Sequence, residues 1–264
     1  MLLNNSIFAT GMRGTIGRHL SSHVIELNCD LTALPAEINE VKNSTLVHLA
    51  SRVGSMEVDR DPIGAHKINV EGTLQLAKLA IRANCKRFVF ISTSHVYRPH
   101  RLRIKETDVI EPLGRYAEQK YQTEIMLEEM FSQQTKSQLI VLRIFSVIGK
   151  DSKPFTLGGA VQRIVAEKHK VKIPNASDVR DFMSPQTVAH AIESLARSNR
   201  VNDKILNVCS GVGTTVRDAA VNLAFQHEGE LREDHFIEGN SAVPVMIGDP
   251  SLLNRYLTIK PLLD

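Results

Sequence analysis

Short apolar runs alternate with longer amphipathic stretches through the first half of the chain. An apolar run without polar alternation is typical of a strand that is buried on both faces of a parallel sheet. A stretch in which apolar residues recur every three or four positions indicates a helix with one buried face. The apolar runs predict strands at residues 6–9, 24–27, 45–51, 86–97 and 139–145.

The amphipathic stretches predict the helices that connect these strands. A short helix is expected at 15–22, a long one at 62–83, and a third that carries Tyr116 and ends near Phe131. Strands that alternate with helices are joined by right-handed crossovers, which make successive strands parallel. The predicted fold class is therefore α/β, with a Rossmann-type doubly wound parallel sheet.

The pattern changes after residue 150, where prolines and glycines interrupt it. Helices and short strands are predicted there at 159–168, 171–173, 180–182 and 185–197. A further apolar run at 205–208 is expected to rejoin the main sheet. We predict a Rossmann domain at 1–150 and a small C-terminal lobe at 151–264, which covers the edge of the sheet where ligands bind.

The composition is that of an ordinary globular protein. Of the 264 residues, 42% are hydrophobic and 23% are charged, and both values are close to the average for folded domains. The net charge of +3 is too small to indicate nucleic-acid binding, and only 5% of the residues are aromatic, too few to suggest a surface that stacks on bases. We expect no nucleic-acid partner.

Cys29, Cys85 and Cys209 are widely spaced and form no Cys-x-x-Cys pair. This favours reduced thiols in a cytoplasmic protein over disulfides or a zinc site, and we expect no bound metal. No apolar run reaches the ~18 residues of a spanning helix, and the amino terminus leads directly into a strand pattern without a signal sequence. The expected location is the cytoplasm, without a membrane partner.

A glycine-rich turn follows the first predicted strand, with the spacing Gly11-x-x-Gly14-x-x-Gly17. A strand, a glycine turn and the start of a helix form the usual binding site for a pyrophosphate. Gly11 would allow the tight turn, Gly14 would let the backbone approach the phosphates, and Gly17 would let the helix pack on the sheet. The sequence thus predicts a dinucleotide cofactor.

The choice between NAD and NADP stays open. An acid at the end of the second strand would bind the adenine ribose, whereas basic residues would accept a 2′-phosphate. Glu26 and Asp30 lie on either side of Asn28 at this position, and Arg13 lies within the glycine turn. Arg13 slightly favours NADP.

Candidate catalytic groups lie beyond the fourth predicted strand. Thr93, Ser94 and His95 fall at its carboxyl end, where ligands bind in open α/β sheets. Tyr116 and Lys120 are four residues apart and share one face of a helix. A lysine ammonium beside a phenol would lower the tyrosine pKa, so that Tyr116 could exchange a proton near neutral pH.

Further short motifs follow in order along the chain: Asp30-Leu31, Leu49-Ala50-Ser51, Asn69-Val70-x-Gly72-Thr73, Ser92-Thr93-x-x-Val96-Tyr97 and Arg180-Asp181-Phe182. Together with the glycine turn and the Tyr116-x-x-x-Lys120 pair, they resemble the extended short-chain dehydrogenase/reductase family. This family comprises NAD(P)-dependent epimerases, dehydratases and reductases of sugar nucleotides. The chain would be an unusually short member.

The resemblance implies a role for each matching residue. The catalytic residues would be Thr93, Tyr116 and Lys120. The cofactor would contact Gly11, Met12, Arg13, Gly14, Thr15, Ile16, Gly17, Asp30, Leu31, Leu49, Ala50, Ser51, Asn69, Tyr116 and Lys120. The substrate would contact Ser94, His95, Ser146 and Arg180, and the lobe at 151–264 would bind it.

Departures from the family pattern narrow the expected activity. Dehydratases of the family have Asp-Glu after the catalytic threonine, where this chain has Ser94-His95, so a 4,6-dehydratase is disfavoured. Ser146 replaces an asparagine that usually contacts the substrate. His95 matches an acid/base position of the GDP-fucose synthases, although a structural histidine is the simpler interpretation. A basic loop beside the site either attracts a diphosphate or is merely solvated; it contains Arg98, His100, Arg101, Arg103 and Lys105.

The resemblance therefore predicts an epimerase or 4-keto reductase that acts on a nucleotide-activated sugar by hydride transfer. The alternative is a catalytically silent NAD(P)-binding regulatory protein of the same fold. The predicted helices at 64–83 and 114–131 are those that the family pairs into a homodimer.

Overall fold

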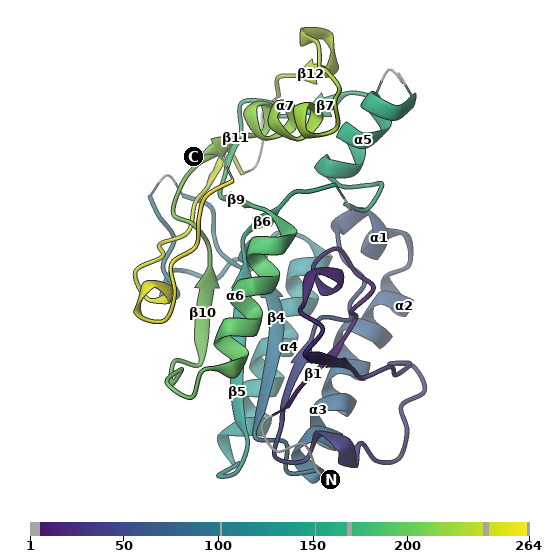
Figure 1. Cartoon of the computed structure of the whole chain (residues 1–264), viewed down its shortest axis with the longest axis vertical. Coiled ribbons are helices and arrows are strands. Elements are labelled where there is room, and N and C mark those ends of the chain that lie inside the picture. The colour runs from purple at the N-terminus through teal and green to yellow at the C-terminus, as the bar shows by residue number, and fades with distance from the viewer. Residues whose placement is uncertain (1–5, 101, 151, 168–170, 240–242, 263–264) are drawn as a thin grey trace.

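The computed structural model describes residues 6–100, 102–150, 152–167, 171–239 and 243–262 (Figure 1). Its centre is a six-stranded sheet with the strand order β10-β5-β4-β3-β1-β2. Every pair of neighbouring strands is parallel, which confirms the predicted fold class. The strands are β1 (Ile7–Thr10), β2 (Val24–Glu26), β3 (Thr45–His48), β4 (Arg87–Thr93), β5 (Gln138–Ile144) and β10 (Ile205–Val208).

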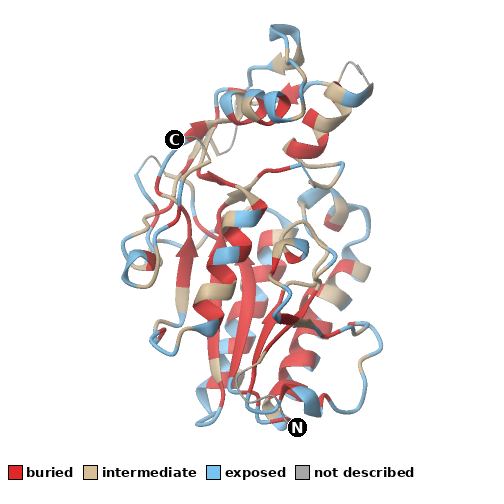
Figure 2. Cartoon of the chain, viewed as in Figure 1, coloured by how far each residue is buried: buried red, intermediate tan, exposed pale blue. Residues whose placement is uncertain are grey.

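Helices cover both faces of this sheet, so its central strands are buried on both sides (Figure 2). On one face α6 (Pro185–Arg197) packs through residues such as Ile192 and Leu195. On the other face α3 (Thr73–Arg82) and α4 (Arg115–Ser132) pack against Phe88 and Phe90 of β4. All seven residues of β4 are buried, which explains why the strand appears in the sequence as a continuous apolar run.

The helix expected at 15–22 does not form. The structure has a single 3₁₀ turn, Gly17–His19, between the glycine turn and β2. Few residues remain there once the glycine turn is complete, and forming an isolated helix of such length is unfavourable. Glu193 of α6 supports this segment instead, since its carboxylate accepts hydrogen bonds from the backbone N–H (3.1 Å) and the hydroxyl (2.6 Å) of Ser21.

The helix predicted at 62–83 is a continuous helical run with an irregular centre. It begins as α2 (Pro62–His66), where the Asp61 carboxylate caps the N–H of Gly64. A π-helical segment, Lys67–Gly72, then leads into α3. Such segments widen a helix by one residue and occur often at functional sites. Asn69 lies within this segment and is 1% exposed.

The lobe lies above the carboxyl edge of the sheet (Figure 1). Its core forms where α5 (Leu157–Glu167) packs on α7 (Val216–Gln226). Short strands complete it, in the groups β11-β8-β13, β12-β7 and β6-β9. These are β6 (Ser146–Val147), β7 (Ile173–Pro174), β8 (Val179–Arg180), β9 (Phe182–Met183), β11 (Thr214–Thr215), β12 (Phe236–Ile237) and β13 (Val245–Met246).

The chain returns to the main sheet after entering the lobe. The predicted strand at 205–208 is β10, which pairs with β5, and α6 lies on the face of the same sheet. Part of the chain after residue 150 therefore belongs to the sheet layers. The division into two domains at residue 150 stays a prediction. One further helix, α1 (Ser55–Arg60), packs against α2 and α4.

A buried histidine links three of these elements. The Nδ1 atom of His48 lies 2.7 Å from the hydroxyl of Thr10, and its Nε2 atom lies 2.9 Å from the hydroxyl of Thr73. Burial, together with the nearby Lys120 charge, lowers the pKa of His48 to about 3. The imidazole is therefore neutral in the folded protein and connects β1, β3 and α3.

This histidine should make stability depend on pH. Between its ordinary pKa of 6.5 and its folded pKa of about 3, the unfolded chain binds a proton that the folded chain excludes. The free energy of unfolding should therefore fall as pH drops through this window, with a contribution approaching about 1.4 kcal/mol per pH unit. Urea unfolding from pH 7 to pH 4 should show a shallower dependence in His48→Gln than in the parent. His23→Gln, at an exposed position, should leave the slope unchanged; equal slopes in all three proteins would contradict the assignment.

Candidate active site

The carboxyl ends of β1, β3, β4 and β5 lie at one edge of the sheet, facing the lobe (Figure 1). This edge is where open α/β sheets bind ligands. The glycine turn follows β1, Leu49 and Ala50 follow β3, and Thr93 ends β4. The fold therefore brings together residues that the sequence places far apart.

The glycine turn packs directly against the end of β3. Gly11 has φ +71°, and a Cβ atom at this position would lie 2.6 Å from the backbone nitrogen of Ala50. The turn closes on itself through a 3.0 Å hydrogen bond from the Gly14 N–H to the Gly11 carbonyl. A Cβ at Gly17 would meet the Gly11 carbonyl and Met12. Gly17 therefore lets the turn close, and the prediction that it packs a helix on the sheet is wrong.

The charged side chains around this turn differ in how strongly neighbouring groups hold them. The Arg13 side chain is 83% exposed and has a 3.7 Å ion pair with Glu26. Arg18, which sequence reasoning missed, folds back on the turn and donates to the Arg13 carbonyl at 3.1 Å. Asp30 accepts hydrogen bonds from the N–H and hydroxyl of Thr32, which lower the pKa of its carboxyl group.

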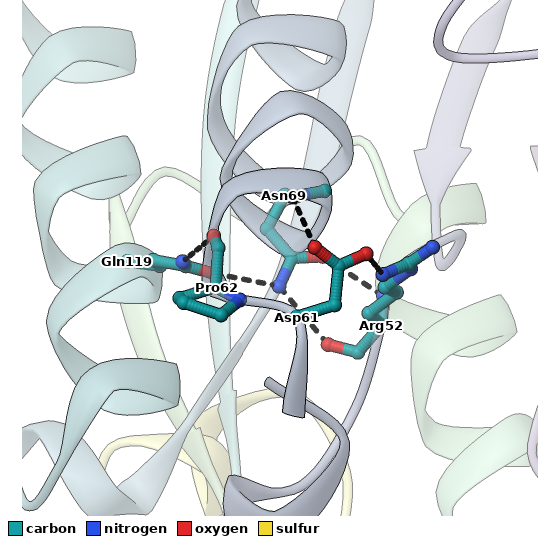
Figure 3. Close-up of polar contacts among 6 residues, drawn as sticks. Arg52, Asp61, Pro62, Asn69 and Gln119 are labelled. Carbon is teal, nitrogen blue, oxygen red and sulfur yellow. Dashed lines mark hydrogen bonds and ion pairs between the residues drawn. The ribbon is translucent and has the colours of Figure 1, made fainter. Parts of the chain in front are cut away.

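The Asn69 amide is an anchor between three segments (Figure 3). Its oxygen accepts from the hydroxyl of Ser51 (2.8 Å) and the N–H of Arg52 (2.8 Å). Its nitrogen donates to the carbonyl of Arg52 (3.0 Å) and to Gln119 (3.0 Å). Both donor positions and both acceptor positions of the amide are thus used. Asn69 holds the loop after β3 against α4, which is a different role from the predicted cofactor contact.

Two further contacts fix the same junction. Arg52 forms an ion pair with Asp61, with 2.5 Å between Nη1 and Oδ2. The Gln119 amide nitrogen lies 3.5 Å from the carbonyl of Pro62 at the start of α2 (Figure 3). The loop that contains Ala50 and Ser51 is therefore held by α2, the π-helical segment and α4 together.

Tyr116 and Lys120 lie on one face of α4, as predicted. Lys120 is 3% exposed, and its Nζ atom lies 5.9 Å from the centre of the Tyr116 ring. The Lys120 amine donates a 2.9 Å hydrogen bond to the carbonyl of Ile91 and lies 4.8 Å from the centre of the Phe90 ring. Tyr116 is half-buried. Within the described part of the chain, its hydroxyl has no hydrogen-bond partner.

Burial shifts the pKa values of both groups. It lowers the pKa of Lys120 to about 7, although the Glu124 carboxylate opposes this shift. It raises the pKa of the Tyr116 phenol above its ordinary value. The prediction that Lys120 lowers the pKa of Tyr116 is thus wrong for this structure. Helical spacing puts the two side chains on one face, but the amine binds a backbone carbonyl and the phenol is desolvated.

The groups that follow β4 face the lobe. The Thr93 hydroxyl is buried and accepts a 3.3 Å hydrogen bond from the N–H of His95, which leaves its own proton available to donate. The Ser94 hydroxyl donates to the sulfur of Met246 at 3.3 Å. This contact draws Ser94 toward β13 and uses its proton, so the predicted substrate contact by its side chain would be as a hydrogen-bond acceptor.

His95 and Arg180 lie near each other, as two predicted substrate residues should. Burial and the charge of Arg180 lower the pKa of His95, so its imidazole is more easily kept neutral. Arg180 is in turn held by Asp178, with an ion pair of 2.8 Å. Ser146 starts β6 and is paired with Phe182 of β9, which places it where the main sheet meets the lobe.

The basic loop after Tyr97 is partly neutralised by its own neighbours. Arg98 pairs with Glu111 at 2.6 Å, and His100 lies 3.0 Å from the carboxylate of Asp108. Arg101 falls outside the described residues. These contacts favour the interpretation of a solvated loop over that of a diphosphate site.

Sequence reasoning missed two separate groups of buried polar contacts. Arg143 of β5 pairs with Glu124 of α4 at 2.6 Å, and the two side chains are 3% and 4% exposed. Asp181 is buried and accepts hydrogen bonds from the backbone N–H groups of Ser210 (2.9 Å) and Gly211 (2.8 Å). A charged residue within the apolar run at 139–145 is the signal that could have revealed the first pair.

The described residues offer neither a metal site nor a membrane span. They contain no cluster of three histidine, cysteine or acidic side chains that could hold a metal ion. The described helices also include none with the length and apolar character needed to span a bilayer.

Comparison with known proteins places these features in a family. The chain is 24% identical to a GDP-6-deoxy-D-talose 4-dehydrogenase from Aggregatibacter actinomycetemcomitans, over 98% of this chain and 95% of that protein. It is 26% identical to a GDP-6-deoxy-D-mannose reductase from Pseudomonas aeruginosa, over 87% of this chain and 82% of that protein. UDP-glucose 4-epimerases are also similar, among them one from Rhizobium leguminosarum, 27% identical over 69% of this chain and 63% of that protein.

Solved structures share the fold. MoeE5 in complex with UDP-glucose and NAD superposes with a TM-score of 0.82 at 23% identity, over 98% of this chain and 95% of that one. RMD from Pseudomonas aeruginosa complexed with NADPH superposes with a TM-score of 0.80 at 24% identity, over 98% of this chain and 94% of that one. The model of the NAD dependent epimerase/dehydratase family matches residues 28–209. This chain therefore belongs to that family, which confirms its resemblance to the extended short-chain dehydrogenases/reductases.

Proposed function

We propose that this enzyme reduces a 4-keto group on a nucleotide-activated sugar with NAD(P)H, with Tyr116 as the proton donor. One observation carries the proposal: Tyr116, Lys120 and Thr93 lie at the carboxyl edge of the sheet that also presents the glycine turn. Family membership supplies the class, an NAD(P)-dependent oxidoreductase or epimerase. Two relatives that match most of this chain are named as a dehydrogenase and a reductase of GDP-linked 6-deoxy sugars, which makes such sugars the first substrates to test.

The residues fit a dinucleotide. Gly11 packs so closely on Ala50 that no side chain separates the glycine turn from the end of β3, and the backbone can approach a pyrophosphate there. When bound, the cofactor supplies or accepts the hydride. Gly14, Met12 and the other turn residues would hold its phosphates, and Lys120 would lie on its nicotinamide side.

The protein groups supply the proton and the orientation. Thr93 would donate a hydrogen bond to the substrate oxygen and fix its position. Tyr116 would transfer its phenolic proton to that oxygen as the carbonyl is reduced. Burial raises the pKa of Tyr116, so the phenol is protonated at neutral pH. That is the form that reduction requires.

Epimerisation is the second candidate. It is favoured by the UDP-glucose 4-epimerases among the relatives, and the same three residues would serve it. Tyr116 would take the proton of the substrate hydroxyl as the hydride on the same carbon passes to the bound cofactor, and would return the proton as the hydride is delivered to the other face of the ketone. The catalytically silent regulator is disfavoured because Tyr116 and Lys120 are both present and adjacent.

The cofactor preference and the assembly belong to the same proposal. The Arg13 side chain is 83% exposed and its ion pair with Glu26 is long, at 3.7 Å, so it could turn to bind a 2′-phosphate, and NADP is slightly favoured. Ile125 and Met126 are exposed on α4, and they support a homodimer formed by helices 64–83 and 114–131. Cytoplasmic location stays a prediction.

The test is turnover with a GDP-linked 4-keto-6-deoxyhexose, with NADPH and NADH supplied in turn. A reductase should consume one nicotinamide per sugar, seen as loss of its near-ultraviolet absorbance, and should form the 4-hydroxy product. An epimerase would interconvert UDP-glucose and UDP-galactose with no net change in the nicotinamide. Tight dinucleotide binding without conversion of any GDP-, UDP- or dTDP-linked hexose would reject the enzymatic proposal.

A further inference from the structure

Glu124 connects the helix that carries Tyr116 and Lys120 to the sheet. It lies one turn beyond Lys120 on α4, and its side chain is 4% exposed. One carboxylate oxygen accepts a hydrogen bond from the hydroxyl of Ser92. The other lies 2.6 Å from Nη2 of Arg143, and Nε of Arg143 lies 3.2 Å from both.

These contacts converge on the end of β4. Ser92 is directly opposite Arg143 in the register of β4 and β5. Its neighbour Ile91 provides the carbonyl that binds the Lys120 amine at 2.9 Å, and its other neighbour is Thr93. Lys120 and Glu124 thus attach two successive turns of α4 to the strand end that carries Thr93.

The pair is costly as a purely structural device. Burying a carboxylate and a guanidinium requires their desolvation, and apolar replacements of similar size are often neutral or stabilising. Nη1 of Arg143 is also buried and has no hydrogen-bond partner among the described residues, which adds to this cost. A buried pair of this kind beside a catalytic lysine therefore suggests a role in the site.

Glu124 is also the acidic group whose charge reaches Lys120. The other titratable groups around the amine are Tyr116 on α4 and His48 on β3, and both are neutral near pH 7. Arg143 on β5 points its charge at Glu124, and Phe90 of β4 presents its ring. A carboxylate one helical turn away stabilises the ammonium form of a buried lysine.

We propose that Glu124 is a positioning residue for the Tyr116–Lys120 pair, because it holds α4 against the end of β4 and places a carboxylate one helical turn from the Lys120 amine. This inference depends on the proposed function only where it assigns a catalytic role to Tyr116 and Lys120. Its structural part, the effect of Glu124 on Lys120, can be measured without any substrate.

The main test is the titration of Lys120 by NMR in protein labelled with ¹³C at lysine Cε, with Lys120→Met used to assign the signal. In Glu124→Gln we expect the pKa of Lys120 to fall by about one unit or more. Glu128→Gln is the matched control, since Glu128 lies one turn further along α4, is exposed, and pairs with Lys204 at 3.4 Å. It should leave the titration of Lys120 unchanged.

A double variant separates charge from packing, because Glu124→Gln alone leaves the Arg143 charge buried and could fail to fold. Glu124→Leu combined with Arg143→Met removes both charges and keeps the volume. This variant should fold, and Lys120 should still titrate at the lowered pKa. In the plot of kcat against pH, the limb that reflects titration of Lys120 should shift to lower pH by as much as the pKa of Lys120 falls.

An unchanged Lys120 titration in the double variant would overturn the proposal, and so would a loss of activity with no shift of the pH profile. If Lys120 shifts as expected but no nucleotide sugar is converted by the parent protein, the positioning role stands and the proposed function fails.

Discussion

We expect Tyr116→Phe to lower kcat for ketone reduction by roughly 10²–10⁴-fold, the usual contribution of a positioned general acid. The substitution removes one oxygen that has no hydrogen-bond partner within the described residues. The free energy of unfolding and the dissociation constant of the dinucleotide should therefore change little. Single-turnover measurements of nicotinamide oxidation would isolate the chemical step from product release.

Tyr121→Phe provides the control for this prediction. Tyr121 lies on the same helix, is half-buried, and packs against the apolar core on one face of the sheet. Its loss of a hydroxyl should leave kcat unchanged. Full turnover by Tyr116→Phe, or an equal loss in both variants, would show that Tyr116 does not supply the proton.

The sheet was predictable because burial on both faces leaves a plain signal in the sequence. The strand at 205–208 matches β10 in both bounds, and its return beside β5 follows from the same apolar character. The helix predicted at 15–22 does not form, although its residues have a pattern compatible with a helix. The turn from Gly11 to Gly17 takes up the length that a helix would need before β2. Glu193 of α6 holds this segment in place instead, by accepting a hydrogen bond from Ser21.

The sequence predicted which residues lie in the candidate site better than it predicted the contacts between them. Spacing alone put Tyr116 and Lys120 on one face of α4, yet it could not show that Lys120 would bind the carbonyl of Ile91. The hydrogen bonds of the Asn69 amide oxygen and nitrogen could not be predicted for a similar reason, because their partners lie 17 and 50 residues away in the sequence. Such contacts depend on packing between distant segments, which periodicity does not encode.

The buried pair of Glu124 and Arg143 illustrates this limit most clearly. Each residue lies in a different predicted element, and no sequence motif joins the two. Only the register of β4 and β5 sets Ser92 opposite Arg143, and only the packing of α4 brings Glu124 to both. The sequence shows a charged residue in a buried strand, but its partner is fixed by the tertiary structure.

The second large effect is expected from Gly11→Ala. At φ +71° an alanine is strained by about 1–2 kcal/mol. Its Cβ would also lie 2.6 Å from the nitrogen and 2.8 Å from the Cα of Ala50, which are backbone atoms and cannot rotate away. Such overpacking typically costs about 1–3 kcal/mol more. The free energy of unfolding should therefore fall by about 2–5 kcal/mol in urea unfolding.

Gly114→Ala separates the two costs, because Gly114 has φ +81° and, among the described residues other than its chain neighbours, none has an atom within 4 Å of the added Cβ. The free energy of unfolding of this variant should fall only by the cost of placing an alanine at positive φ. Gly114 also lies away from the glycine turn. Gly11→Ala should in addition move the turn away from the end of β3, and the dissociation constant of NADPH, followed by nicotinamide fluorescence, should rise at least about tenfold, equivalent to about 1.4 kcal/mol. Equal destabilisation of the two variants with unchanged NADPH binding would mean that the close packing of Gly11 on Ala50 does not shape the cofactor site.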